Sequence, residues 1–193
     1  MKERIKHFIL FIILIGIDQA SKFWVKAVLM NNDPIVIIPG VLELQYLENQ
    51  GAVWGILSGK VDFLKVFSFF VFLLILFLYL KIPQGKKYNV LKIIAVFILA
   101  GAVGNLIDRL YLNYVVDFIY FKLINFPIFN IADSYLTVCS ILLFLLAIFY
   151  YKDDDFAFLE QIFNKKNQAT SAGQESKPED NTTKPADDHK SNS

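Results

Sequence analysis

Long apolar stretches alternate with shorter polar ones along this chain of 193 residues. Four stretches approach the ~20 mostly apolar residues that a helix needs to cross a bilayer. They cover approximately residues 5–25, 63–82, 90–107 and 132–151. The pattern predicts an all-α membrane protein with four transmembrane helices, within a domain of residues 1–163.

The segment between the first two apolar stretches has a different pattern. Residues 33–58 contain β-branched runs that are interrupted by Pro34, Pro39 and Gly40. Such runs with Pro and Gly at their ends are typical of short strands. We therefore expect a strand pair or small sheet that lies on the membrane.

The end of the chain is polar. From residue 164 to residue 193 it is rich in Lys, Asn, Ser, Thr, Asp and Pro and has no aromatic residue. Such a segment cannot bury enough apolar surface to offset its conformational entropy. It is predicted to be a disordered tail.

Composition supports this division. Hydrophobic residues make up 55% of the chain, which is too many for an ordinary soluble domain of this size. The net charge of +1 indicates no charged partner such as a nucleic acid. The only cysteine, Cys139, excludes an intramolecular disulfide, and without a Cys/His cluster no metal or cofactor is expected.

The distribution of basic residues predicts the orientation. They gather before the first stretch and around the connection between the second and third: Lys2, Arg4, Lys6, Lys81, Lys86, Lys87 and Lys92. By the positive-inside rule these regions are cytoplasmic. Both termini, including the tail, are then inside, and the connections 26–62 and 108–130 are outside.

The first apolar stretch has a basic start, like a signal peptide. However, Asp18-Gln19-Ala20-Ser21-Lys22 follows where a small-residue cleavage site would stand, so a retained helix is favoured. Asp18 and Lys22 are four residues apart and can pair on one helical face. An ion pair with a lysine that reaches the interface is the structural alternative to a functional role.

Polar residues gather at the predicted outer membrane boundary: Asp18, Asn105, Asp108, Arg109, Asp117, Asn130 and Asp133. Gly101 and Gly104 are explained by close helix packing. Asn130 is a candidate N-cap with Asp133 three positions later, and capping and catalysis stay open for this pair. Asp117 lies in an apolar stretch without a capping role, so a shared polar site is the economical interpretation.

An aspartyl pair fits this set better than serine catalysis does. Ser21 and Lys22 are adjacent and point in different directions on a helix, and Ser134 has no lysine near it in sequence. Two carboxyls in contact share one proton, so one activates a water while the other polarises the scissile carbonyl. The helix dipole favours charge on Asp133, which makes Asp117 the hypothetical proton carrier.

Five motifs occur in order: Asp18-Gln19-Ala20-Ser21-Lys22, Asn49-Gln50-Gly51-Ala52-Val53-Trp54-Gly55, Gly101-Ala102-Val103-Gly104-Asn105-Leu106-Ile107-Asp108-Arg109, Val115-Val116-Asp117-Phe118 and Phe129-Asn130-Ile131-Ala132-Asp133. Over residues 5–151 the chain resembles lipoprotein signal peptidase, the bacterial signal peptidase II family. It departs from the family pattern at Val53 and Trp54, where Ala and Phe are usual. We expect altered loop packing and retained activity.

The resemblance implies an intramembrane aspartyl endopeptidase with four helices and a small extracytoplasmic β-cradle, in the bacterial cytoplasmic (inner) membrane. Its site faces outward, and prolipoproteins are cleaved before the diacylglyceryl-modified cysteine. Membrane lipids and globomycin-type cyclic peptide inhibitors are further expected partners, and no metal or cofactor is implied. A monomer is the default expectation.

The resemblance also assigns residues by motif position. Asp117 and Asp133 would be catalytic. Eight others would bind substrate or support the pair: Asp18, Lys22, Asn49, Gly51, Asn105, Asp108, Arg109 and Asn130. The main alternative is a small transporter or proton-relay protein that uses intramembrane carboxylates, against which the polar residues lie at one face and no inverted repeat is visible.

Overall fold

The computed structural model describes residues 2–51, 56–57 and 59–159. The chain divides into two compact units, Met1–Asp155 and Phe156–Ser193. Of the second unit only residues 156–159 are described. The predicted tail at 164–193, the predicted domain end at 163 and the departures Val53 and Trp54 lie outside the described residues.

Four long helices make up most of the first unit: α1 (Lys2–Leu29), α2 (Val61–Lys81), α3 (Asn89–Leu112) and α4 (Ile131–Phe149). All four are long and apolar enough to cross a membrane. The predicted membrane fold with four helices is confirmed. A short 3-10 helix, η2 (Lys86–Tyr88), joins α2 to α3, and η4 (Asp153–Phe156) follows α4.

Two helices run further than their apolar stretches. α1 continues to Leu29 and α3 to Leu112, beyond the expected ends at 25 and 107. Their last turns carry polar side chains that find partners in other elements, so helical backbone persists where hydropathy falls. α3 then ends at Asn113, whose φ of 65° is left-handed and stops the helix.

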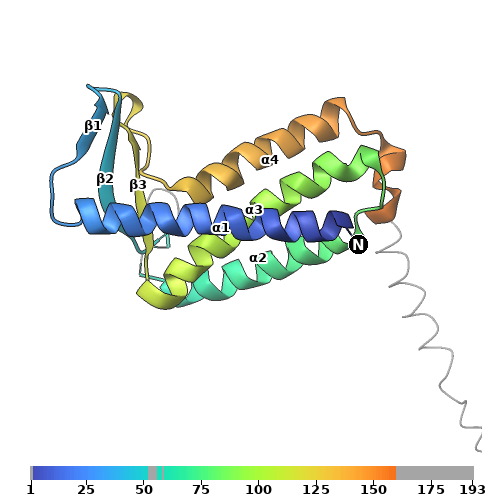
Figure 1. Cartoon of the computed structure of the whole chain (residues 1–193), viewed down its shortest axis with the longest axis horizontal. Coiled ribbons are helices and arrows are strands. Elements are labelled where there is room, and N and C mark those ends of the chain that lie inside the picture. The colour runs from blue at the N-terminus through green and yellow to red at the C-terminus, as the bar shows by residue number, and fades with distance from the viewer. Residues whose placement is uncertain (1, 52–55, 58, 160–193) are drawn as a thin grey trace, which may run out of the picture. The chain divides into compact units, whose positions relative to one another are not determined.

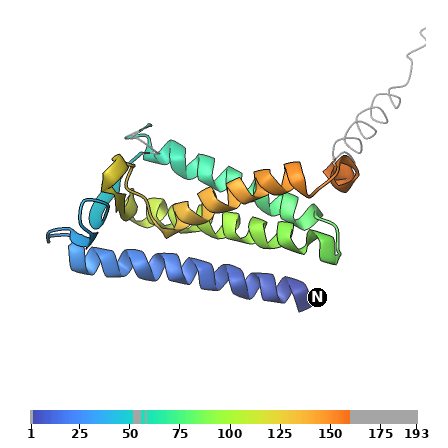
Figure 2. The ribbon, with the colours of Figure 1, turned by 90° about the horizontal axis from the view of Figure 1, so that it is seen from above.

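α3 is the central helix, and it packs against α1, α2 and α4 (Figure 2). In its most apolar window 56% of the residues are buried, against 6% for α2. Two glycines permit this packing. A Cβ at Gly101 would lie 2.6 Å from the Ala132 carbonyl oxygen of α4, and one at Gly104 would lie 2.5 Å from Asp18 Oδ2 of α1.

A small antiparallel sheet lies at the end of the bundle where α1 finishes, opposite the N-terminus (Figure 1). Its strands are β1 (Ile35–Ile38), β2 (Leu42–Asn49) and β3 (Val115–Phe121), in the order β1-β2-β3. The predicted strand pair is present as β1 and β2. The third strand was not predicted, because four consecutive residues, 115–118, are buried and its sequence lacks alternation.

The sheet is fixed to the bundle by an apolar cluster. Val25 and Leu29 at the end of α1 pack with Val116 and Phe118 of β3. In the β2–β3 register Asp117 stands opposite Leu47. The short 3-10 helix η3 (Lys122–Ile124) and a bridge between Ile119 and Phe129 then return the chain to the start of α4.

Candidate active site

Asp117 is buried in the sheet, with a side chain that is 1% exposed. Asn49 Nδ2 donates to its Oδ2 at 2.8 Å, and Asn130 Nδ2 donates to its Oδ1 at 2.7 Å. Burial, followed by the nearby charge of Asp133, raises the pKa of the Asp117 carboxyl to about 7. Asp117 can therefore hold a proton near neutral pH.

Asp133 lies in the first turn of α4. Its backbone N–H donates to Asn130 Oδ1 at 2.9 Å, while the Asn130 N–H donates to Asp133 Oδ2 at 3.2 Å. This reciprocal pair is a capping box. Asn105 Nδ2 donates to the other oxygen, Asp133 Oδ1, at 2.7 Å. These donors and the N-terminus of α4 stabilise a negative charge on this carboxylate.

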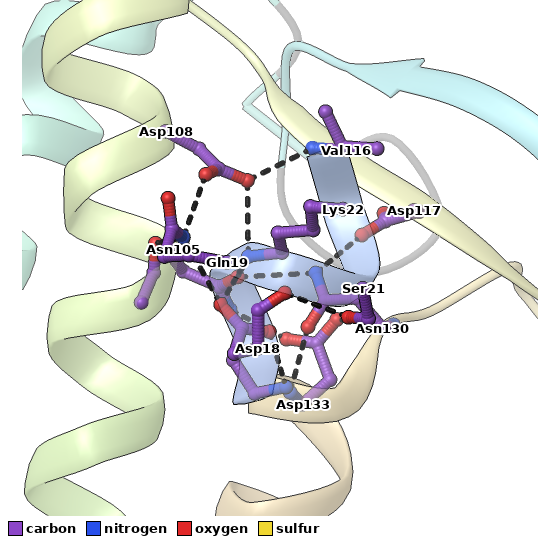
Figure 3. A network of polar contacts seen from close by, with 12 residues as sticks. Asp18, Gln19, Ser21, Lys22, Asn105, Asp108, Val116, Asp117, Asn130 and Asp133 are labelled. Atoms are coloured by element: carbon purple, nitrogen blue, oxygen red, sulfur yellow. Dashed lines mark hydrogen bonds and ion pairs between the residues drawn. The ribbon is translucent and has the colours of Figure 1, made fainter. Parts of the chain in front are cut away.

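Asn130 is the N-cap of α4, so the capping interpretation is confirmed, whereas a catalytic role for this pair stays a prediction. Its carbonyl oxygen Oδ1 caps α4, while its Nδ2 donates to Asp117 and to Asn105 Oδ1, the latter at 3.0 Å. One fully buried residue thus contacts both carboxylates, Asp117 through its side-chain amide and Asp133 through its backbone N–H (Figure 3). The cap and the site are parts of the same arrangement.

A buried ion cluster lies behind the carboxylates. Lys22 Nζ is 2.9 Å from Asp18 Oδ2 and 3.0 Å from Asp108 Oδ2, and it donates to Asn105 Oδ1 at 3.0 Å. The pairing of Asp18 with Lys22 is confirmed. The alternative of a lysine that reaches the interface is wrong, because Lys22 is 3% exposed and enclosed by these three acceptors.

This cluster also holds the backbone beside each of the two aspartates. Asp18 Oδ1 accepts from the N–H of Ala132, the residue before Asp133, at 2.9 Å. Asp108 Oδ2 accepts from the N–H of Val116, the residue before Asp117, at 3.1 Å. Lys22 therefore pairs with both carboxylates that accept from these backbone N–H groups, one group in α4 and one in β3 (Figure 3).

Gln19 is a member of the cluster that the sequence analysis did not assign. Its Nε2 donates to Asp18 Oδ2 at 3.1 Å, to Asp108 Oδ1 at 3.0 Å and to the Gly104 carbonyl at 3.2 Å. Lys22 supplies one positive charge for the two buried carboxylates, and the neutral Gln19 amide adds a hydrogen bond to each of them. Its spacing of three residues from Lys22, which places both on one helical face, was the available signal.

Asp117 and Asp133 both line a cleft of about 1390 Å³. Its walls come from β2, β3, α2, α3, α4 and the segment 125–129. Toward the helices the lining is largely apolar, and includes Phe67 and Val71 of α2 and Leu136 of α4. The cleft therefore joins a polar end with two carboxylates to an apolar groove between helices.

Comparison with known families shows what kind of protein this is. The family model for signal peptidase (SPase) II matches residues 10–149. The chain belongs to the signal peptidase II family. It is therefore a protease, and its four apolar helices make it a multi-pass membrane protein.

Relatives within the signal peptidase II family are similar over most of their length. A lipoprotein signal peptidase of Streptococcus thermophilus is 44% identical over 133 residues, which are 69% of this chain and 86% of the relative. One of Enterococcus faecalis is 41% identical and covers 72% and 85%. One of Streptococcus pyogenes is 39% identical and covers 81% and 99%.

Solved structures agree with this assignment. A bacterial membrane enzyme determined by the in meso method at 2.3 Å resolution matches with a TM-score of 0.67 and 34% identity, over 74% of this chain and 87% of that chain. A second, at 1.9 Å resolution, matches with the same score and 31% identity, over 76% and 94%. Membership of the signal peptidase II family does not favour the transporter alternative.

In this signal peptidase the eight residues that were expected to bind or support fall into two groups. Those that line the cleft are Asn49, Gly51, Asn105 and Arg109. Those that are buried behind it are Asp18, Lys22, Asp108 and Asn130. Among the described residues, no group of three His, Cys, Asp or Glu side chains is arranged to hold a metal ion.

Proposed function

We propose that this protein is an intramembrane aspartyl endopeptidase that removes the signal peptide from prolipoproteins, cleaving before the diacylglyceryl-modified cysteine. One observation carries the catalytic assignment: Asp117 and Asp133 line one cleft and are joined by Asn130. The relatives' name, lipoprotein signal peptidase, supports the substrate class.

In the proposed resting state Asp117 carries the proton and Asp133 is ionised. The pKa of about 7 for Asp117 supports its protonation, and the donors from Asn105 and Asn130 support the charge on Asp133. Asp133 takes a proton from a water that attacks the scissile carbonyl carbon. Asp117 gives its proton to the carbonyl oxygen, which yields a neutral tetrahedral gem-diol.

Collapse of this intermediate restores the site. Asp133 returns its proton to the nitrogen of the leaving cysteine as the C–N bond breaks. Asp117 recovers a proton from one hydroxyl of the gem-diol, whose carbon becomes the new carboxyl end of the signal peptide. The two aspartates end in their starting protonation states, so no other acid or base is needed.

In this proposal the cleft binds both the peptide and the lipid of the substrate. Arg109 Nη2 lies 3.5 Å from the Gly51 carbonyl oxygen, and Asn49 Oδ1 accepts from the Gly51 N–H at 2.9 Å. In this proposal these polar groups hold the peptide near the carboxylates. The acyl chains of the modified cysteine would occupy the apolar groove between α2 and α4, which supplies binding energy remote from the scissile bond.

The orientation is part of the proposal. Basic residues near the start of α1 and between α2 and α3 favour a cytoplasmic position for both termini. The sheet and the carboxylates then face outward in the bacterial cytoplasmic membrane, where the lipid-modified cysteine of a translocated precursor arrives. The proposed enzyme is a monomer. Globomycin-type cyclic peptides are its proposed inhibitors.

Cleavage of a diacylglyceryl-modified precursor peptide by the purified full-length protein tests the function. We expect turnover by the parent protein and by the control variant Asp33→Asn, because Asp33 is an exposed residue just before β1. Asp117→Asn and Asp133→Asn should each lower kcat by about 10³-fold or more while the fold is kept. Turnover of either variant at the parental rate contradicts the aspartyl assignment.

An unlipidated precursor of the same sequence tests the substrate class separately. If the groove binds acyl chains, this peptide should be cleaved at least about tenfold less efficiently in kcat/KM, which corresponds to about 1.4 kcal/mol of lost binding. Equal cleavage of both peptides would be consistent with peptidase activity but would contradict recognition of the lipid.

A further inference from the structure

A second polar cluster lies at the opposite end of the helices from the carboxylates. Residues from α1, α2, the following connection and α3 surround a small hollow of about 10 Å³: Glu3, Arg4, His7, Tyr79, Leu80, Gln84 and Lys92. Lys92 and Asn105 are both on α3 and are separated by about 20 Å at 1.5 Å per residue. The two sites are therefore independent in space.

Lys92 is a buried cation without a carboxylate partner. It is 7% exposed, and its Nζ donates to the neutral Gln84 Oε1 at 3.2 Å. Across the described residues, no carboxylate lies within ion-pairing distance of this ammonium. A buried ammonium is costly unless its charge is compensated, so a nearby anion would stabilise Lys92.

The neighbouring groups strengthen this interpretation. Arg4 is exposed and lines the same hollow, and the described part of the chain gives its guanidinium neither a hydrogen bond nor an ion pair. His7, 6% exposed, shares a hydrogen bond of 2.9 Å between its Nδ1 and the Tyr79 hydroxyl. The one carboxylate present, Glu3, already pairs with Lys6 at 2.8 Å.

We propose that this cluster binds the phosphate of an anionic membrane phospholipid, with Arg4 and Lys92 as its charged partners. The hollow accommodates a group of about one oxygen atom, so one phosphate oxygen would reach Lys92 while the headgroup rests on Arg4 at the mouth. Exposed apolar side chains at the same end, Ile5, Phe8 and Leu80, provide the surface for the acyl chains. Basic pockets between transmembrane helices bind lipid headgroups in this way.

Binding can be measured without catalysis, so its failure would leave the proposed peptidase function untouched. The purified full-length protein in a non-ionic detergent is titrated with dihexanoyl phosphatidylglycerol, and with dihexanoyl phosphatidylcholine as the zwitterionic comparison. We expect the anionic lipid to bind about tenfold tighter and to raise Tm by mass action. Equal affinity for the two lipids overturns the proposal.

Three variants locate the site. Arg4→Gln, on an exposed side chain, should weaken binding of the anionic lipid about tenfold, and Lys92→Gln at least as much. Lys86→Gln removes an exposed charge in η2 that does not line the hollow, and should bind like the parent. An equal loss in Lys86→Gln and Arg4→Gln indicates nonspecific attraction and overturns the site.

Inorganic phosphate is the last ligand to be compared. We expect it neither to raise Tm nor to compete with the short-chain lipid at equal concentration, because the acyl chains contribute to binding. Competition by free phosphate at the same concentration would overturn the lipid assignment.

Discussion

At the scale of single residues, Asn130 makes an ordinary helix cap part of the proposed active site. Helix N-caps are usually judged by the stability that they add. Here the cap's amide nitrogen also donates to Asp117, so the orientation of the cap fixes the geometry of the proposed dyad. An Asp at this position would keep the cap oxygen but lose the donor.

This difference gives a prediction for Asn130→Asp. The fold should be retained, because Asp caps helices about as well as Asn. Activity should fall by about 10²-fold or more, because a third carboxylate is placed against Asp117 and the donor is removed. Parallel measurements of Tm and kcat check this, and parental activity in a well-folded variant would contradict it.

The raised pKa of Asp117 predicts the pH dependence of the reaction. The proposed mechanism needs this carboxyl protonated, and its pKa is about 7. As pH rises through that value the proton is lost, so kcat/KM should fall about tenfold per pH unit above it. A profile measured from about pH 5.5 to about pH 9 checks the sign. A profile that is flat to its alkaline end would contradict Asp117 as the acid.

Lys22 should be the residue whose loss costs most stability. Lys22→Gln leaves Asp18 and Asp108 buried without their cation, and breaking a buried ion pair in this way costs about 3–5 kcal/mol. The matched control, Lys6→Gln, breaks an exposed pair with Glu3 and should cost at most about 1 kcal/mol. Thermal unfolding of both variants in detergent compares them, and similar Tm values would refute the prediction.

At the scale of elements, the packing of α3 against α4 depends on Gly101. Gly101→Ala would push a methyl group against the Ala132 carbonyl, and such overpacking costs about 1–3 kcal/mol. Gly16→Ala is the control, because a Cβ there meets nothing within 4 Å. We expect Gly16→Ala to be neutral or stabilising by up to about 1 kcal/mol, and Tm values that rank the two the other way would contradict this.

The elements also show what a sequence can predict. The hydropathy of each helix is a property of one continuous stretch, and the pairing of Asp18 with Lys22 and the cap at Asn130 depend on neighbours within one helical turn. Each of these features is present. β3 could not be recognised, because its buried run resembles a short apolar connection. The contact of Asn49 with Asp117 joins residues 68 positions apart and depends on the register of β2 with β3, which no local pattern specifies.

At the scale of the whole molecule, the cleft connects the two carboxylates with the space between α2 and α4. Ser68 of α2 lines this cleft, whereas Phe70 on the same helix is 62% exposed. Ser68→Trp should narrow the groove and lower kcat/KM for the lipidated peptide about tenfold, mainly through KM. Phe70→Trp, which changes an outward face, should behave like the parent.

Both kcat and KM are measured for Ser68→Trp and Phe70→Trp. A Ser68→Trp enzyme with parental KM and kcat would show that acyl chains do not pass this part of α2. An equal decrease in both variants would point to a general effect on the helix and would equally contradict the groove.

The low burial of α2 has a consequence for the evolution of its sequence. Leu64 is the one described α2 residue that is buried, so the exposed face of this helix is constrained mainly by the bilayer, where many apolar sequences serve equally well. α3, by contrast, is constrained by three neighbours and by the ion cluster. We expect lineages of this family to accumulate substitutions in α2 several times faster than in α3, with Leu, Ile, Val and Phe exchanging freely.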